Sequence, residues 1–293
     1  MKGLGRKYDV LLGYLLITPV VILIFIVIGV PFVNAIYLSF TDKVAGSVPK
    51  FIGFKNYINL FSDPDYIIVL KNTFVYTFTS IGFKLMIGIF LAVVLNQKFF
   101  GRSIIRTLLL LPWALSGMVA AMSWKWMYND TYGIINALLM KAHIVHVPVL
   151  WLSDARLALI SCIIVNVWRG VPFFFFSVLG GLQTIDSQMY EAADIDGAGV
   201  IKKFFCITLP SLKSVIMITT VLSTIWTFND FENVFLITGG GPLHASSIIS
   251  TYTYEMAFLQ NEMGKAMSVA ASVIPIILMM ILIPLRKLNK EEK

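Results

Sequence analysis

The sequence predicts an all-α integral membrane protein with six transmembrane helices, and its composition and hydropathy carry this prediction. The chain of 293 residues is 58% hydrophobic and only 13% charged, whereas soluble domains are about 45–50% apolar and about 25% charged. Its mean hydropathy is +0.82. Apolar stretches of roughly 20 residues, enough to cross a bilayer core of about 30 Å, recur along the chain. We expect a single transmembrane domain over residues 1–293.

Six spans fit the apolar pattern best. A basic N-terminus followed by apolar residues is typical of a signal peptide, but here the apolar run is too long and lacks a small-residue cleavage site, so we expect a retained first span. Pro19 and Pro31 predict a tilt or bend in it, and Pro112 predicts a kink in the third span. The expected spans cover about Leu11–Phe40, Asn72–Leu95, Leu108–Tyr128, Leu157–Gly181, Ser214–Leu236 and Met267–Leu285.

The basic residues predict the orientation of the spans. Thirteen of the 23 lysines and arginines lie on the side that holds both termini and residues 182–213, and eight lie on the other side. Since positive residues favour the cytoplasm, we place both termini and the loop 182–213 there. Lys84 falls inside the second span, and we expect its ammonium group to reach outward to the membrane surface.

Several functions find no support in the sequence. The net charge of +7 comes from residues at span ends, not from a basic groove, so no nucleic-acid partner is expected. His143 and His146 lack further ligands for a metal site. Thr238–Pro242 reads T-G-G-G-P, but no helix with GK[ST] follows, so a sharp turn is favoured over a phosphate cradle. No HExxH, GxSxG or Walker motif is present, so we expect no enzyme activity and no ATP hydrolysis by this chain.

The loop 182–213 is a polar island in an apolar chain. Asp186 is suited to cap a short helix, and Gly197 to end it in the left-handed conformation. Pro210 suits the first turn of a following helix. A polar helix–turn–helix on the cytoplasmic face is most simply a docking surface, and a solvated connecting loop is the alternative.

The same loop carries a family resemblance. Glu191, Ala192, Ala193 and Gly197 form E-A-A-x-x-x-G, and after nine residues 207–210 read I-T-L-P. This pattern resembles the signature loop of permease subunits in binding-protein-dependent ABC importers. The resemblance implies the type I permease fold and a loop that couples the permease to a cytoplasmic ATPase subunit. ATP and Mg²⁺ would be bound by the ATPase partners, and this chain would hold no cofactor.

Polar residues inside the fourth and fifth spans predict a substrate path. Polar groups within spans are costly and usually face the bundle interior or a cavity. These residues form two sets, one in each span, and within each set the helical spacing puts the side chains on one face. At 1.5 Å per residue, Arg169 lies roughly 18 Å and Asp230 roughly 24 Å from the shared loop, near the membrane middle. The first set is Asn166, Arg169, Gly170 and Phe173, and the second is Ser223, Thr227 and Asp230.

Arg169 leaves three alternatives open. It could pair with Asp230 as a structural tie, bind a carboxylate or phosphate of the substrate, or face a water-filled path. The aromatic residues Trp168 and Phe173–Phe176 could stack on sugar rings, although packing is the commoner role of such side chains.

The sequence around these residues resembles that of the carbohydrate-uptake, maltose-type branch of the same permeases. The segments Asn166–Pro172, N-V-W-R-G-V-P, and Phe228–Phe231, F-N-D-F, carry this resemblance, and T-G-G-G-P is similar to the first permease of such heterodimers. Thr227 and Asp230 differ from the amides of a neutral maltodextrin site, which puts maltose itself in doubt.

The resemblance implies import of a sugar, oligosaccharide or related polyol across the bacterial inner membrane. The implied partners are a second permease, two ATPase subunits and an extracytoplasmic solute-binding protein. An anionic substrate, such as a uronate oligosaccharide or glycerol phosphate, is the alternative. An ion-coupled secondary transporter is a more distant one, because only Asp230 could titrate along a path.

Overall fold

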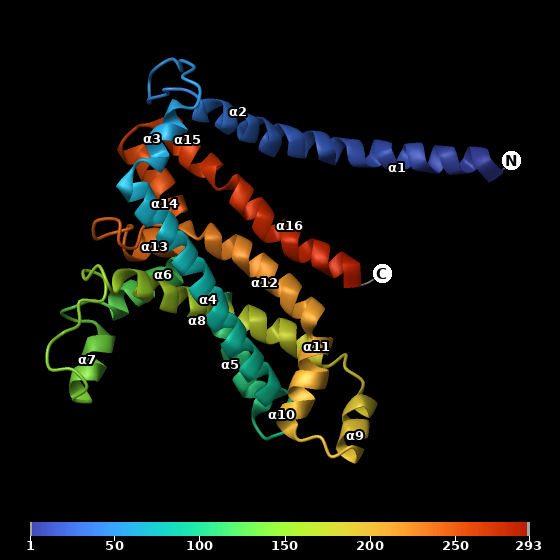
Figure 1. Cartoon of the computed structure of the whole chain (residues 1–293). Coiled ribbons are helices and arrows are strands. Elements are labelled where there is room, and N and C mark those ends of the chain that lie inside the picture. Colours follow the sequence, from blue (N-terminus) through green and yellow to red (C-terminus); the bar gives the residue numbers. More distant parts are fainter. Residues whose placement is uncertain (1, 292–293) are drawn as a thin grey trace. The chain divides into compact units, whose positions relative to one another are not determined.

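The computed structural model describes residues 2–291, and these form helices joined by loops (Figure 1). The chain divides into two compact units. One comprises Met1–Ser62 and Thr253–Val273, and the other Asp63–Tyr252 and Ile274–Lys293. The expected single domain stays a prediction.

The first unit begins with a long apolar helix. Helix α1 (Lys2–Ile24), a π-helical turn (Phe25–Gly29) and α2 (Val30–Ser39) follow one another without a break. Within it, Leu12–Ser39 is apolar enough to cross a membrane, and its most apolar window is not buried by the rest of the chain. Pro31 has no N–H to donate to the preceding turn, and the hydrogen-bond ladder widens into the π turn just before it.

The loop after α2 is ordered by a buried asparagine. Asn56, in α3 (Lys55–Phe61), donates from Nδ2 to the carbonyls of Ser39 and Thr41 at 2.9 and 2.8 Å. In the same unit, Gly264 of α15 (Met263–Ser272) lies so close to Thr41 that a Cβ atom would stand 2.1 Å from its carbonyl oxygen. These contacts fix the loop against the ends of its own helices.

The second unit is built around two long helices, α4 and α8. They pack along each other, α12 lies against both, and α5 packs on α8 (Figure 1). The helices of this unit are α4 (Pro64–Asn96), α5 (Arg102–Ala114), α6 (Gly117–Met127), α7 (Ile134–Lys141), α8 (Ala158–Leu182), α9 (Ser187–Ile195), α10 (Val200–Lys203), α11 (Leu209–Ser211), α12 (Lys213–Phe228), α13 (Phe231–Ile237), most of α14 (Ile249–Tyr254) and α16 (Ile274–Glu291).

Two of the expected spans are not single helices. Between α5 and α6 the chain turns by 95°. The break lies at Leu115 and Ser116 and not at Pro112, because Ser116 adopts an extended conformation and its Oγ accepts from the amide of Val119. The fifth expected span, Ser214–Leu236, ends early, at Phe228, where Asn229 and Asp230 interrupt the helix.

In the described residues four helices are long and apolar enough to cross a membrane, and six spans result if each bent pair crosses once. The second bent pair, residues 200–211 with α12, turns by 64°. The count of four to six spans therefore includes the six expected from the sequence.

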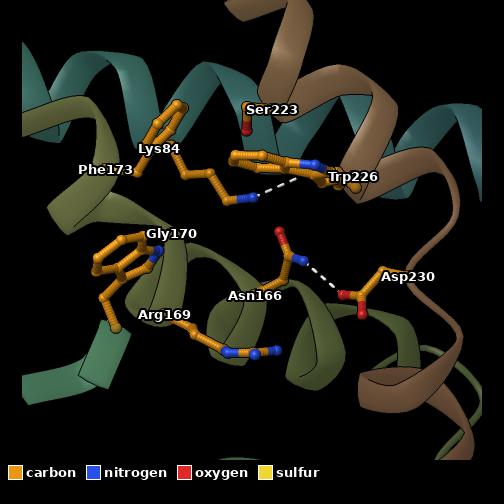
Figure 2. A pocket seen from close by; sticks show the side chains of 10 residues that line it. Lys84, Asn166, Arg169, Gly170, Phe173, Ser223, Trp226 and Asp230 are labelled. Carbon is orange, nitrogen blue, oxygen red and sulfur yellow. Dashed lines mark hydrogen bonds between the residues drawn. The ribbon is translucent and has the colours of Figure 1, made fainter. Parts of the chain in front are cut away.

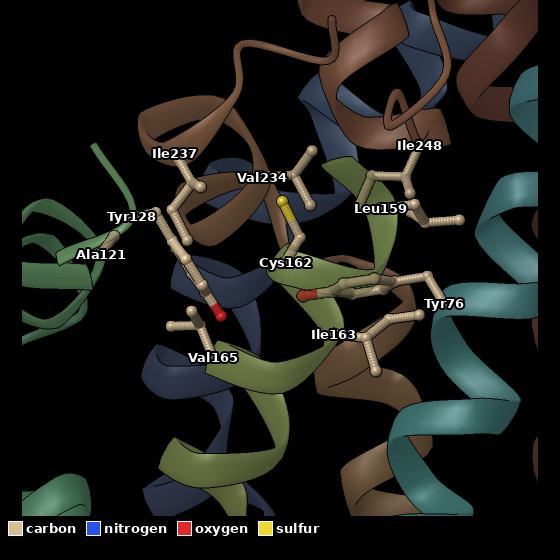
Figure 3. Packing of buried hydrophobic residues seen from close by; sticks show 10 residues of the cluster. All are labelled: Tyr76, Ala121, Tyr128, Leu159, Cys162, Ile163, Val165, Val234, Ile237 and Ile248. Carbon is tan, nitrogen blue, oxygen red and sulfur yellow. The ribbon is translucent and has the colours of Figure 1, made fainter. Parts of the chain in front are cut away.

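Two buried clusters hold the second unit together. One joins α4, α6, α8 and α13, with Tyr76 and Cys162 near its centre (Figure 3). The other joins the far ends of α4 and α8 to the start of α12 through Leu212. There Gly181 approaches Leu212 so closely that a Cβ atom would lie 2.7 Å from Leu212 Cδ2.

Gly88 sets the separation of α4 and α8. A Cβ atom on it would lie 2.5 Å from the Cβ of Phe174, and small residues allow such close helix contacts in membranes. We expect Gly88→Val to cost about 1–3 kcal/mol through overpacking, seen as a lower thermal midpoint of the purified protein. Gly82→Val is the matched control, since nothing lies within 4 Å of its Cβ position. Equal midpoints for the two variants would contradict this explanation.

Candidate functional site: a polar cavity between α4, α8 and α12

A cavity of about 230 Å³ lies within the second unit. All seven residues expected on the substrate path line it: Asn166, Arg169, Gly170, Phe173, Ser223, Thr227 and Asp230. Lys84 from α4, Trp113 from α5 and Trp226 from α12 complete the lining (Figure 2). The structure therefore brings together two faces that lie at least 50 residues apart in the sequence.

The helix geometry explains this convergence. Asn166, Gly170 and Phe173 lie one turn apart on α8 and face α12. Ser223 and Thr227 lie one turn apart on α12. Asp230 follows the end of α12, so it reaches the cavity from the break that precedes α13.

Asp230 is the centre of a hydrogen-bond network. Its Oδ2 accepts from the Tyr76 hydroxyl and from Asn166 Nδ2, both at 2.6 Å. Its Oδ1 accepts from the amide of Asn233 at 3.4 Å and so caps α13. Asn233 Nδ2 donates in turn to the Tyr76 hydroxyl at 2.8 Å and to the Cys162 carbonyl at 3.0 Å. The Asp230 carboxylate thus connects α4 and α8 to the segment between α12 and α13.

Of the three alternatives for Arg169, the pairing with Asp230 is not the one that the structure shows. Arg169 Nη1 instead lies 3.9 Å from Glu232 Oε2, and both side chains are partly exposed. The Asp230 carboxylate already accepts three hydrogen bonds from uncharged donors, whereas Glu232, in the first turn of α13, lies beside Gly117 at the start of α6. The guanidinium therefore lies between the cavity and a different acidic residue.

The outward orientation expected of Lys84 is wrong. Its side chain is buried, at 4% exposure, and Nζ donates to Thr227 Oγ1 at 3.0 Å (Figure 2). Its stem crosses Gly170, where a Cβ atom would stand 2.4 Å from Lys84 Cε. The lysine lies midway along α4 on the side that packs against α8 and α12, so the short route for its ammonium is into the cavity.

Two tryptophans of the lining were not expected from the sequence. Trp226 lies three residues after Ser223 on α12, and its ring centroid is 5.0 Å from that of Phe173. Helical spacing from Ser223 was the available signal for it. Trp113 follows Pro112 on α5, and no local pattern distinguishes it from an interfacial tryptophan.

The other aromatic residues of α8 pack into the protein. Phe174 and Phe175 are fully buried, and Trp168 contacts Trp124 with ring centroids 5.5 Å apart. Only Phe173 of this group reaches the cavity.

The loop 182–213 has the local structure expected from its sequence. Asp186 Oδ1 accepts from the amide of Gln188 and caps α9, and Gly197 follows with φ +71°. Pro210 lies in α11, just before the bend into α12. Glu191 and Ala192 are exposed on α9, and Ala193 is half-buried.

Part of the exposed surface of this loop is apolar. Ile195, Val200, Ile201 and Phe205 are each at least 60% exposed. Internal polar contacts hold the loop in shape, namely Tyr190 with Thr208 at 2.9 Å and Lys203 with Asp194 at 2.5 Å. Single apolar residues on a surface are ordinary, but a contiguous group of them marks an interaction site.

The described residues contain no group of three or more His, Cys, Asp or Glu side chains that could hold a metal ion. Cys162 is a buried free thiol and Cys206 an exposed one.

Comparison with known proteins agrees with this architecture. The chain is 33% identical over 265 residues to the trehalose/maltose transport system permease MalF of Thermococcus litoralis, covering 90% of this chain and 89% of the relative. It is 33% identical over 265 residues to the sulfoquinovosyl glycerol transport system permease SmoG of Agrobacterium fabrum, covering 89% and 85%.

A solved bacterial ABC transporter involved in the import of alginate has the same fold. Its matching chain superposes with a TM-score of 0.84 over 100% of both chains at 21% identity. Residues 84–285 match the model of the family described as the binding-protein-dependent transport system inner membrane component. This match covers more than half of the chain, and with the two relatives it shows that the chain belongs to that family of ABC transporter permeases.

Proposed function

We propose that this chain is the transmembrane permease subunit of an ATP-driven importer and that a carbohydrate passes through the cavity between α4, α8 and α12. One observation carries the proposal: the polar residues of two spans converge on one cavity with aromatic walls. Such a site combines apolar surfaces with a few polar groups that fix orientation, as ligand sites generally do. Asn166, Arg169, Gly170, Phe173, Ser223, Thr227 and Asp230 are the proposed contacts.

The permeases named above serve trehalose and maltose, and sulfoquinovosyl glycerol. These names support a carbohydrate as the substrate here.

The loop 182–213 is proposed as the coupling element. Glu191, Ala192, Ala193 and Gly197 would contact a cytoplasmic ATPase subunit, and the apolar side chains around them would be covered in that contact. ATP and Mg²⁺ would be bound by two such subunits. This assignment places the loop and both termini in the cytoplasm, in agreement with the distribution of lysine and arginine.

A second permease and an extracytoplasmic solute-binding protein would complete the transporter. The family description names dependence on a binding protein, and a solved alginate transporter is in complex with a periplasmic protein. Trp113 and Trp226 are each more than half exposed in this chain, which is consistent with a cavity that the second permease closes.

Reconstitution of the whole transporter in proteoliposomes tests the proposal. We expect uptake of the sugar carried by the cognate binding protein to require ATP and to stop with vanadate. Uptake that persists without ATP and collapses with a protonophore would instead identify an ion-coupled transporter.

A further inference from the structure

We propose that the cavity is built for a sugar that bears an anionic group, a carboxylate or a sulfonate, and that Lys84 and Arg169 bind this group. The inference rests on the proposed function and narrows its substrate class. It follows from two features of the cavity: the placement of its charges and its unpaired polar atoms.

The two cations of the cavity differ in their acidic neighbours: Arg169 has one carboxylate within 4.0 Å, and Lys84 has none among the described residues. Asp230, the acidic residue of the lining, receives its hydrogen bonds from Tyr76, Asn166 and the backbone of Asn233. Among the described residues, no carboxylate lies within 4.0 Å of Lys84 Nζ, and that of Arg169 is Glu232 at 3.9 Å. The lining therefore presents two cationic groups and one carboxylate whose hydrogen bonds come from uncharged donors.

The cavity contains hydrogen-bond donors and one acceptor that lack partners among the described residues. The Lys84 ammonium has three N–H donors, and within the described residues Thr227 Oγ1 accepts one of them. Asn166 Oδ1 is buried and has no hydrogen-bond partner in this part of the chain. In Figure 2 this oxygen points toward Lys84 Nζ. A sugar acid complements this set, since its anion accepts and its hydroxyls donate.

A neutral sugar satisfies the site less well. It can accept hydrogen bonds from Lys84 and Arg169 but brings no negative charge to the buried Lys84 ammonium, which has no carboxylate within 4.0 Å among the described residues. Hydrogen bonds between charged partners are roughly twice as strong as neutral ones. The aromatic wall of Phe173 and Trp226 suits the sugar ring in either case, so the cations decide the preference.

The test measures binding to the complete transporter in nanodiscs without its binding protein, by saturation-transfer difference NMR. This arrangement isolates the selectivity of the membrane site. The probes are matched pairs: digalacturonate against digalactose for the carboxylate, and 6-deoxy-6-sulfoglucose against glucose for the sulfonate. We expect at least one anionic probe to bind roughly tenfold or more tightly than its neutral counterpart, in line with one charge-assisted hydrogen bond.

Three variants separate charge recognition from structure. Lys84→Met and Arg169→Gln should each weaken binding of the anionic probe more than binding of the neutral one, and so reduce the preference for the anionic probe. Lys125→Met is the matched control, because this exposed lysine donates to the Leu236 carbonyl outside the cavity, and it should retain the preference. If Lys84→Met fails to assemble with its partner subunits, Arg169→Gln decides, since its side chain is 37% exposed and can be replaced at less structural cost.

Equal binding of both members of each pair by the wild type would overturn the inference. So would a proportional loss of anionic and neutral binding in Lys84→Met and Arg169→Gln, which is what a purely structural role predicts. A transporter that shows the anionic preference without any ATP-dependent uptake would contradict the proposed function and leave the inference standing.

Discussion

Replacing Asp230 by alanine is expected to destabilise the subunit and to abolish uptake. The substitution removes two strong hydrogen bonds, to Tyr76 and Asn166, and the cap of α13. Hydrogen bonds to charged groups contribute about 1.5–3 kcal/mol each, so the loss is on the order of 3 kcal/mol or more. The measurements are the thermal midpoint of the purified transporter and ATP-dependent uptake in proteoliposomes.

Asp230→Asn and Asp154→Asn provide the comparison for this prediction. The first keeps an oxygen for one donor and a similar shape, so it should fall between wild type and Asp230→Ala in stability. Asp154 is a carboxylate in a loop, where its bond with the exposed Arg156 lowers its pKa, and its replacement should leave uptake unchanged. If Asp230→Ala had the thermal midpoint and the uptake rate of the wild type, the hydrogen-bond network around Asp230 would not have the role assigned to it.

Replacing Gly197 by valine is expected to uncouple ATP hydrolysis from transport while the subunit still inserts into the membrane. Gly197 has φ +71°, and a β-branched residue in this conformation costs about 1–2 kcal/mol or more. The end of α9 must then change shape, and with it the exposed face of the loop. Uptake and the stimulation of ATP hydrolysis by the loaded binding protein should both fall, with normal amounts of subunit in the membrane fraction.

Two substitutions test the conformational cause. Gly197→Asn should be mild, because asparagine tolerates the left-handed region better than other residues. Gly199→Val adds the same side chain two residues on, where φ is −67° and nothing lies within 4 Å of the Cβ position. If Gly199→Val and Gly197→Val have equal effects, then the positive φ of Gly197 is not the cause.

The elements that local sequence determines could be predicted. Helix α8 follows from its apolar run, and the cap at Asp186 and the stop at Gly197 follow from turn chemistry. The cavity could be predicted because polar residues within spans repeat at helical spacing, so each set had to share a face. All seven residues named on that basis line it.

Features that depend on tertiary partners could not be predicted in the same way. The pairing of Arg169 with Glu232 requires knowing that the helix breaks at Asn229 and that α13 brings Glu232 beside α6. The sequence favours an outward Lys84, because a lysine in a span usually extends to the membrane surface. Its inward route exists only because Gly170 leaves room for the stem, and that contact joins residues on different helices.

The close approach of Gly181 to Leu212 has a mechanical consequence. The contact between Gly181 and Leu212 joins the two ends of the loop 182–213 where they meet α8 and α12, so the loop is attached to the helices at a single packed point. A force applied at α9 would turn α8 and α12 together and would not spread them apart. Inserting residues at the exposed tip of the loop should weaken the transmission of motion from α9 to α8 and α12 and leave the contact between Gly181 and Leu212 intact. Adding a side chain at Gly181 should instead disrupt that contact.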